Sequence, residues 1–140
     1  MQLTDKQRAF LNEVHFAVVS TIASDGMPHQ TVMWYMLDGD QLLLSTPRDS
    51  LKHKHLRRDP RLSVCVEKAY VYVTLTGMVT LDENPVTARA DYQRLGQRYM
   101  RTFDLTSRPP RGGGRLPDLL ARERVTLHMA IDKAQSNGLD

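Results

Sequence analysis

Short runs of hydrophobic and β-branched residues, each ending in turn residues, dominate the chain after its first few residues. Three such runs lie at residues 16–23, 29–37 and 41–45, and an Asp-Gly pair separates each run from the next. An Asp-Gly pair in this setting favours a tight hairpin, because the turn needs a positive φ that glycine tolerates. The pattern therefore predicts an antiparallel meander of three strands.

Three further strands are predicted downstream, the first two at residues 62–67 and 70–81. Along 70–81, tyrosine and threonine alternate with valine and leucine, which indicates one polar or aromatic face and one aliphatic face. Gly77 within this run predicts a β-bulge or a close backbone contact. The run 125–131 predicts a last strand that closes the sheet, and we expect residues 135–140 to fray.

Helix signals lie between the strands. Capping residues and apolar spacing predict helices at residues 4–13, 50–58 and 85–99, and a shorter one at 116–122. Residues 104–117 are rich in proline and glycine and predict a mobile loop. Three arginines of this loop either contact an anionic ligand or are simply solvated: Arg108, Arg111 and Arg115.

Six strands joined mainly by hairpins, with helices at the crossovers, predict a mainly β fold. We expect a six-stranded antiparallel barrel with peripheral helices, formed as one domain by residues 1–140. Trp34 and several tyrosines on the strands would give the barrel an aromatic face, which a ligand or a second subunit could cover.

Composition narrows the classes of function. A net charge of +3 suits an anionic ligand but is low for a dedicated nucleic-acid-binding protein, so we expect no nucleic-acid partner. The single cysteine, Cys65, lies in an apolar run, is expected to be buried and inert, and fits a reducing cytoplasm. No signal sequence and no membrane-spanning apolar run is evident, so we expect a cytoplasmic protein without a membrane partner.

The most informative stretch is residues 44–61, where a strand and a short turn lead into a basic helix. The first amides of such a helix lack internal acceptors, and the helix dipole adds partial positive charge there. With Lys52 and the hydroxyls of Ser45, Thr46 and Ser50, this end predicts an anion pocket, most naturally for phosphate. The simpler alternative is a capped helix whose charged face is solvated.

Other chemistry has little support in the sequence. His53 and His55 lie two apart on a helix and diverge, so no metal site is predicted. No Gly-x-Ser-x-Gly or Gly-x-Gly-x-x-Gly motif is present, which argues against a hydrolase nucleophile and the usual dinucleotide fold. The basic helix, taken alone, could contact a nucleic-acid backbone, but aromatic residues are not interleaved with it.

Several stretches, in the same order and spacing, resemble the pyridoxamine 5'-phosphate oxidase-like flavin and deazaflavin reductases. Residues 18–29 resemble the opening hairpin of that superfamily, and residues 73–79 resemble its strand that ends in glycine. Residues 50–64 are the most specific part, since they are similar to its phosphate-helix signature Lys-x-x-x-Leu-x-x-Asp-Pro-Arg. The resemblance covers roughly residues 10–81 and the last strand.

The resemblance implies a split β-barrel that forms a homodimer, with two cofactor sites between the subunits. The phosphate would be held by Lys52 with the turn before it, and the ring system would lie along the strand 31–34. The implied cofactor-binding residues are Ser45, Thr46, Pro47, Arg48, Ser50, Leu51, Lys52, Thr31, Val32, Met33 and Trp34.

The spacing from His29 through Trp34 to Lys52 looks more like the branch that uses the deazaflavin F420, with FMN as the alternative cofactor. The implied activity is hydride transfer from reduced F420 to a conjugated organic acceptor. His29, Tyr35 and Tyr72 are candidate proton donors, and a structural role is the favoured alternative for each. A non-catalytic flavin- or haem-binding protein is a second interpretation, and a basic nucleic-acid module is a third.

Overall fold

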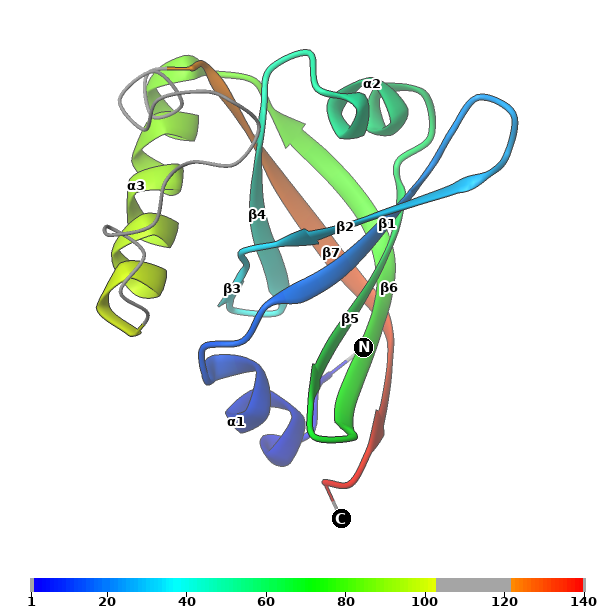
Figure 1. Ribbon diagram of the computed structural model, residues 1–140, viewed down its shortest axis with the longest axis vertical. Helices are drawn as coiled ribbons and strands as arrows, with labels where there is room; N and C mark the ends of the chain where they lie inside the picture. Colours follow the sequence, from blue (N-terminus) through cyan, green and yellow to red (C-terminus); the bar gives the residue numbers. More distant parts are fainter. Residues whose placement is uncertain (1, 103–121, 140) are drawn as a thin grey trace.

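The computed structural model describes residues 2–102 and 122–139. Seven strands and three helices are present in these ranges, and Figure 1 shows the helices around the outside of a strongly curved sheet. In chain order the elements are α1 (Asp5–Asn12), β1 (Ala17–Ile22), β2 (Pro28–Met33), β3 (Met36–Asp38), β4 (Gln41–Pro47), α2 (Leu51–Arg58), β5 (Arg61–Lys68), β6 (Val71–Asp82), α3 (Pro85–Thr102) and β7 (Arg124–Asn137).

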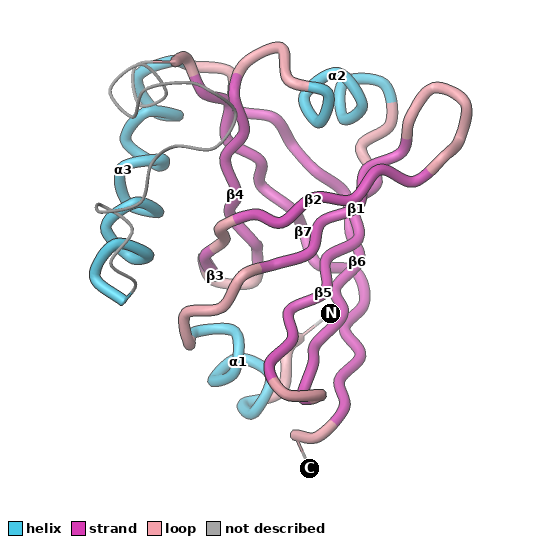
Figure 2. Tube along the Cα trace, viewed as in Figure 1, coloured by secondary structure: helices cyan, strands magenta, loops and turns pink. Residues whose placement is uncertain are grey.

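All strand pairs are antiparallel, and the strand order is β2-β1-β5-β6-β7-β4-β3. β2 and β3 are therefore the two ends of the sheet, although only Trp34 and Tyr35 separate them in the chain. The sheet curls until these ends approach each other, as Figure 2 shows, and the barrel is split at this point. The mainly β antiparallel fold is confirmed.

The prediction of six strands was wrong, because the run 29–37 forms two strands rather than one. Tyr35 is fully buried, and its backbone N–H bonds to the Tyr99 hydroxyl at 3.1 Å instead of to a neighbouring strand. Consequently β2 pairs with β1, and β3 pairs with β4, so the first three predicted strands do not form one continuous meander. The turns at Gly26 and Gly39 do have the expected positive φ.

Gly77 lies where the backbone of β6 is in close contact with that of β7. The register of this pair shifts between Thr76 and Gly77, which confirms the predicted bulge. A Cβ atom at Gly77 would lie 1.9 Å from the carbonyl oxygen of Ala130, a distance that no side chain can adopt. Glycine is needed here because the two backbones touch.

Two predictions for the end of the chain and for the cysteine were wrong. β7 continues to Asn137, and its last residues pair with Tyr72 and Val73, so much of the tail is held in the sheet rather than frayed. Cys65 is half-buried and belongs to the outward-facing residues of β5, whereas its neighbours Val64 and Val66 fill the core. The predicted loop 104–117 and helix 116–122 lie outside the described residues, apart from Arg122.

The helices cover the open parts of the barrel. Thr4 and Gln7 form a reciprocal capping box at the start of α1. Asn84 accepts hydrogen bonds from Val86 N and Thr87 N at the start of α3, which lies along β4 and β7 (Figure 1). α2 lies at the end of the barrel where β4 stops. In the described ranges no helix is long and apolar enough to cross a membrane.

Candidate functional site

A cavity of about 240 Å³ opens at the split, beside the first turn of α2. Five segments surround it: the end of β2, the end of β4, the first turn of α2, one face of α3 and the start of β7. The residues that line it are Val32, Met33, Trp34, Ser45, Thr46, Pro47, Lys52, Tyr92, Leu95 and Arg124. We call this cavity the split pocket.

Seven of the residues implied by the sequence resemblance therefore meet in one place: Val32, Met33, Trp34, Ser45, Thr46, Pro47 and Lys52. Ser50 lies just beneath them, because its hydroxyl is 2.8 Å from that of buried Thr46. Leu51 is largely exposed beside the pocket. Thr31 is not part of the lining, but its hydroxyl is buried without a hydrogen-bond partner among the described residues.

Arg48 takes a different position from the one that the resemblance implies. Its side chain forms an ion pair with Glu123 at 3.0 Å and donates to the carbonyl oxygen of Glu83, and it is not among the lining residues. Its backbone N–H also bonds to Glu123 O at 2.9 Å. In this arrangement Arg48 fixes the turn before α2 to the segment that precedes β7.

Sequence reasoning missed Arg124, the first residue of β7. Its Nε donates to the hydroxyl of Ser45 at 3.0 Å, and its guanidinium lies 3.9 Å from the ring centroid of Tyr92. Burial lowers the pKa of Arg124, so the charged group is held in poorly solvated surroundings. The sequence alone does not give the register between strands. Arg124 reaches the pocket because it pairs with Pro47 of β4.

Lys52 is half-buried and faces the same cavity. Burial, and then the nearby Arg124, lower the pKa of its ammonium group. No carboxylate lies within ion-pair distance of Lys52 or Arg124 in the described parts of the chain. Two cations with no acidic partner share this cavity, and this is the arrangement that an anionic ligand would stabilise.

The first turn of α2 adds hydrogen-bond donors to this charge. Ser50 caps the helix by accepting from His53 N, and Lys54 N bonds to Ser50 O at 3.0 Å. The amides of Leu51 and Lys52 are the donors that the helix cannot satisfy internally. A lysine in the first turn opposes the helix dipole, so its position is favourable only when an anion binds there.

The turn before α2 is held by His53, which is completely buried. Its Nδ1 accepts from Asp49 N at 2.9 Å, so Nε2 carries the proton and donates to Glu83 at 2.6 Å. Hydrogen bonds from Arg57, and then from His53, lower the pKa of Glu83. Asp49 itself has a φ of 63°, a strained value for aspartate, and the bond to His53 stabilises it. His53 thereby fixes the backbone that forms one wall of the pocket.

Aromatic rings form the opposite wall. Trp34 is stacked between Tyr99 and Tyr92, with centroid distances of 5.1 and 6.2 Å. Tyr92 in turn lies beneath the guanidinium of Arg124. A flat aromatic surface beside a cationic end suits a ligand that has both a planar ring and a phosphate.

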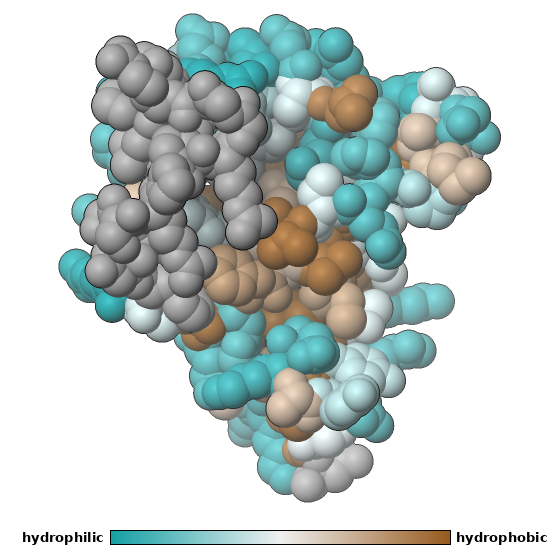
Figure 3. Space-filling model, in the orientation of Figure 1, coloured by the Kyte–Doolittle hydropathy of each residue, from teal (hydrophilic) through white to brown (hydrophobic). Residues whose placement is uncertain are grey.

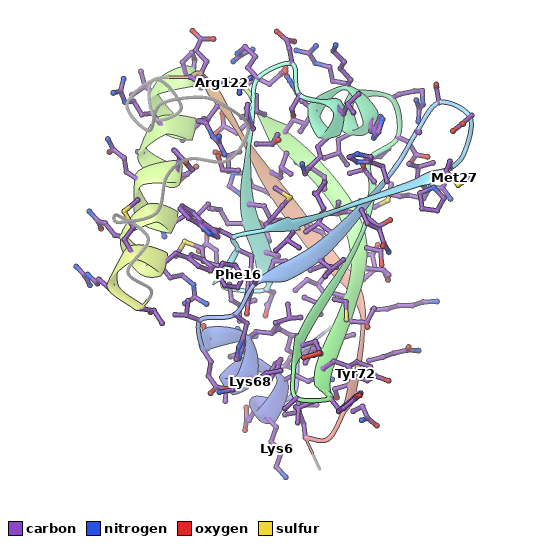
Figure 4. All side chains as sticks on the ribbon, viewed as in Figure 1. Lys6, Phe16, Met27, Lys68, Tyr72 and Arg122 are labelled. Carbon is purple, nitrogen blue, oxygen red and sulfur yellow. The ribbon has the colours of Figure 1, made fainter. Side chains whose placement is uncertain are left out.

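The candidate proton donors His29, Tyr35 and Tyr72 are not among the residues that line the split pocket. The Tyr35 hydroxyl is buried and donates to the Leu11 carbonyl at 2.9 Å, and burial raises the pKa of this phenol. Tyr72 is on β6 near the α1 end of the barrel, as Figure 4 shows. His29 packs edge-on against His55, with ring centroids 5.5 Å apart. Among the described residues, no cluster of three or more histidine, cysteine or acidic side chains could hold a metal ion.

The split pocket alone is smaller than most sites for a cofactor-sized molecule, which measure about 300–1,000 Å³. Its lining includes Val32, however, which is 66% exposed on β2, so the pocket is open to the outside along this strand. β2 pairs only with β1 in the described sheet, so its other edge presents unpaired backbone donors and acceptors. The residues present therefore fit a cofactor whose phosphate binds at Lys52 and whose ring follows β2.

The fold and the site define a split β-barrel with a cationic pocket beside an aromatic wall. A family model described as "Pyridoxamine 5'-phosphate oxidase" matches residues 3–129. The chain therefore belongs to the pyridoxamine 5'-phosphate oxidase family, as the sequence resemblance implied.

Solved structures with the same fold extend this result. An F420 reductase is 20% identical, with a TM-score of 0.75, and the match covers 95% of this chain and 98% of that one. A conserved hypothetical protein from Mycobacterium tuberculosis is 24% identical, with a TM-score of 0.76 and coverage of 97% and 84%. General Stress Protein 26 from Bacillus anthracis is 17% identical, with a TM-score of 0.67 and coverage of 100% and 97%. At these identities the likeness shows the fold alone. No curated protein matches the sequence.

Proposed function

We propose that this protein is an oxidoreductase that uses the deazaflavin F420 to reduce a conjugated organic acceptor in the cytoplasm. The observation that carries the proposal is a pair of cations, Lys52 and Arg124, that have no acidic partner among the described residues and lie next to the aromatic wall of Trp34 and Tyr92. When bound, the reduced cofactor supplies the hydride, and the protein supplies binding, orientation and exclusion of water.

Each part of the pocket has a separate task. Lys52 and the free amides of the α2 first turn bind the phosphate, and Arg124 is kept in place for the same group by Ser45 and Tyr92. The free edge of β2 offers backbone groups to the polar edge of the ring system. Trp34, held between two tyrosines, keeps one side of the pocket flat and dry. His53 keeps the turn before α2 in the binding conformation.

F420 is preferred to FMN for two reasons. The first is the F420 reductase among the proteins of similar fold. The second is the excess of cationic side chains around the pocket, which suits the oligoglutamate tail of F420. FMN remains the second candidate, because it also carries a phosphate that Lys52 and Arg124 would bind.

We further propose that the working form is a homodimer. Phe16, just before β1, exposes hydrophobic surface together with Val18 on β1 and Val32 on β2, and Figure 3 shows a brown area at the centre of the view. Val18 is directly opposite both Val32 and Cys65 in the sheet, so these side chains form one row on the outer face. Val32 also lines the split pocket, so a second subunit on this face would complete the cofactor site.

Titration of the purified protein with F420 and with FMN tests the cofactor. We expect F420 to bind more tightly, and we expect reduced F420 to be oxidised when enones or quinones are added. Preference for FMN would replace F420 in the proposal, and failure to bind either cofactor would reject it. Light scattering tests the dimer: we expect two subunits, and Val18→Asp should give monomers that bind cofactor poorly.

A further inference from the structure

A second cavity lies beside the split pocket, on the flank of α3. It has a volume of about 790 Å³ and an apolar floor that includes Trp34, Tyr92, Gly96 and Met100. Trp34 and Tyr92 line both cavities, so a molecule in the second one would touch the aromatic wall that we assign to the cofactor. We call this second cavity the α3 groove.

The side of α3 that lines the groove differs from the side that packs against the barrel. Ala88, Asp91, Leu95 and Tyr99 are buried against the barrel. The residues that line the groove recur at helical spacing along a neighbouring face, from Arg89 to Arg101. Along a helix this interval measures about 18 Å, enough for an elongated ring system.

The two ends of the groove are positively charged. Arg89 and Arg101 line it, and neither has an ion-pair partner in the described parts of the chain. Arg94 on the same helix differs, because it is 3.5 Å from Asp91 and does not line the groove. An apolar floor with an unpaired arginine near each end is complementary to a planar molecule that carries a negative charge.

We propose that the α3 groove binds the electron acceptor, and that the acceptor is a planar, conjugated organic anion. The assignment of the α3 groove as an acceptor site rests on the proposed function. The expectation that the groove binds a planar anion rests only on its apolar floor and its two arginines. The bound cofactor would supply a hydride to the conjugated system, and water would supply the accompanying proton. Both electrons come from the cofactor, and no bond to the protein forms.

The first experiment needs no cofactor. The fluorescent sulfonate 1-anilinonaphthalene-8-sulfonate and the neutral N-phenyl-1-naphthylamine are titrated into the full-length protein. We expect Gly96→Leu to weaken both probes about tenfold, because a Cβ at Gly96 meets no atom within 4 Å and the larger side chain would fill the groove. Leucine also favours the helix more than glycine does, so the variant should fold. Ala90→Leu, on the same helix outside the groove, is the control.

The charge is tested separately. Arg89→Gln with Arg101→Gln should weaken the sulfonate about tenfold and leave the neutral probe unchanged, while Arg94→Gln should change neither. With bound cofactor, the double variant should raise KM for a naphthoquinone sulfonate, with little change in kcat, and leave menadione unaffected. Equal sulfonate affinity in the Gly96→Leu variant would overturn the groove assignment. If the probes behave as expected but no cofactor binds, the groove stands and the proposed function fails.

Discussion

Two groups of cations in this protein have opposite surroundings. In the first group, the arginine side chain forms an ion pair with a carboxylate. Four such pairs, with N–O distances of 2.7–3.0 Å, are Arg8–Asp40, Arg48–Glu123, Arg57–Glu83 and Arg61–Asp59. Lys52 and Arg124 are less exposed to solvent than Arg57 or Arg61, yet neither forms an ion pair with a carboxylate in residues 2–102 and 122–139, and the pKa of each is lowered by burial.

The difference separates structural charges from binding charges. An exposed ion pair has a small effect on stability and leaves nothing for a ligand to neutralise. A poorly solvated cation without an anionic partner destabilises the free protein, and an anion that binds to it removes that cost. Lys52 and Arg124 belong to the second kind. If this distinction holds, cofactor affinity depends on Lys52 and Arg124, whereas the paired charges affect only the stability of the fold.

The largest effect is expected for Lys52→Ala. Loss of a charge-assisted hydrogen bond to phosphate should weaken cofactor binding by about 1.5–3 kcal/mol. Lys54→Ala is the matched control, since Lys54 is exposed on the same helix and does not line the pocket. Affinity is measured by titration with F420 and FMN, and equal losses in the two variants would contradict the phosphate assignment.

Arg124→Gln should have the next largest effect, about 1–2 kcal/mol in cofactor affinity. We expect less than for Lys52, because one donor of Arg124 is already committed to Ser45. Arg48→Gln is the comparison that sharpens the argument: its guanidinium is paired with Glu123, so we expect lower stability but unchanged affinity. An affinity loss in Arg48→Gln would mean that this arginine turns to the phosphate when cofactor binds.

Alkaline pH should produce a smaller loss of affinity than the alanine variant does. The pKa of Lys52 is below its usual 10.5 in the free protein, so the ammonium group loses its proton earlier than an exposed lysine would. Affinity should therefore be constant at pH values below that lowered pKa and should fall above it, while the neutral amine still donates a hydrogen bond. Lys52→Arg should remove this decline, and a parallel decline in both proteins would assign it to the cofactor.

The sequence identified the parts of the site that are local in the chain. The cap at Ser50, the hydroxyls before it and Lys52 all lie within a few residues, so helix-capping rules alone bring them together. The strands were also readable where alternation was regular, as in β6. The break between β2 and β3 could not be read from the sequence, because Trp34 and Tyr35 continue a β-like pattern. The two strands are separated by the burial of Tyr35 against α1 and Tyr99.

The remaining parts of the site depend on long-range register. Arg124 reaches the pocket because β7 pairs with β4, and Tyr92 reaches it because α3 packs beside both strands. Neither residue carries a local signal for ligand binding. Likewise, His53 resembled any other histidine of a basic helix until its contacts with Asp49 and Glu83 were visible. A single sequence gives residue types and spacings, but it does not show which distant segments face each other.

The smallest effect is expected at a paired charge, in the variant Asp59→Asn. Hydrogen bonds from the side chain and backbone of Arg61 lower the pKa of Asp59 from 3.8 to about 2. A carboxylate with a lowered pKa stabilises the folded protein above the unfolded pKa, and this contribution is lost as the pH falls through the folded value. Asp59→Asn should therefore lower Tm slightly at pH 7, and the difference from the unmodified protein should shrink between pH values of about 4 and 2.

Thermal unfolding measured across this range, together with cofactor titration at pH 7, completes the test. Cofactor affinity should not change in Asp59→Asn, because Asp59 and Arg61 neutralise each other outside the split pocket. A constant difference in Tm down to the lowest pH would show that the variant loses packing rather than charge. A change in affinity would show that paired charges also reach the ligand, and the distinction between structural and binding cations would then fail at a pair whose charges are only 2.8 Å apart.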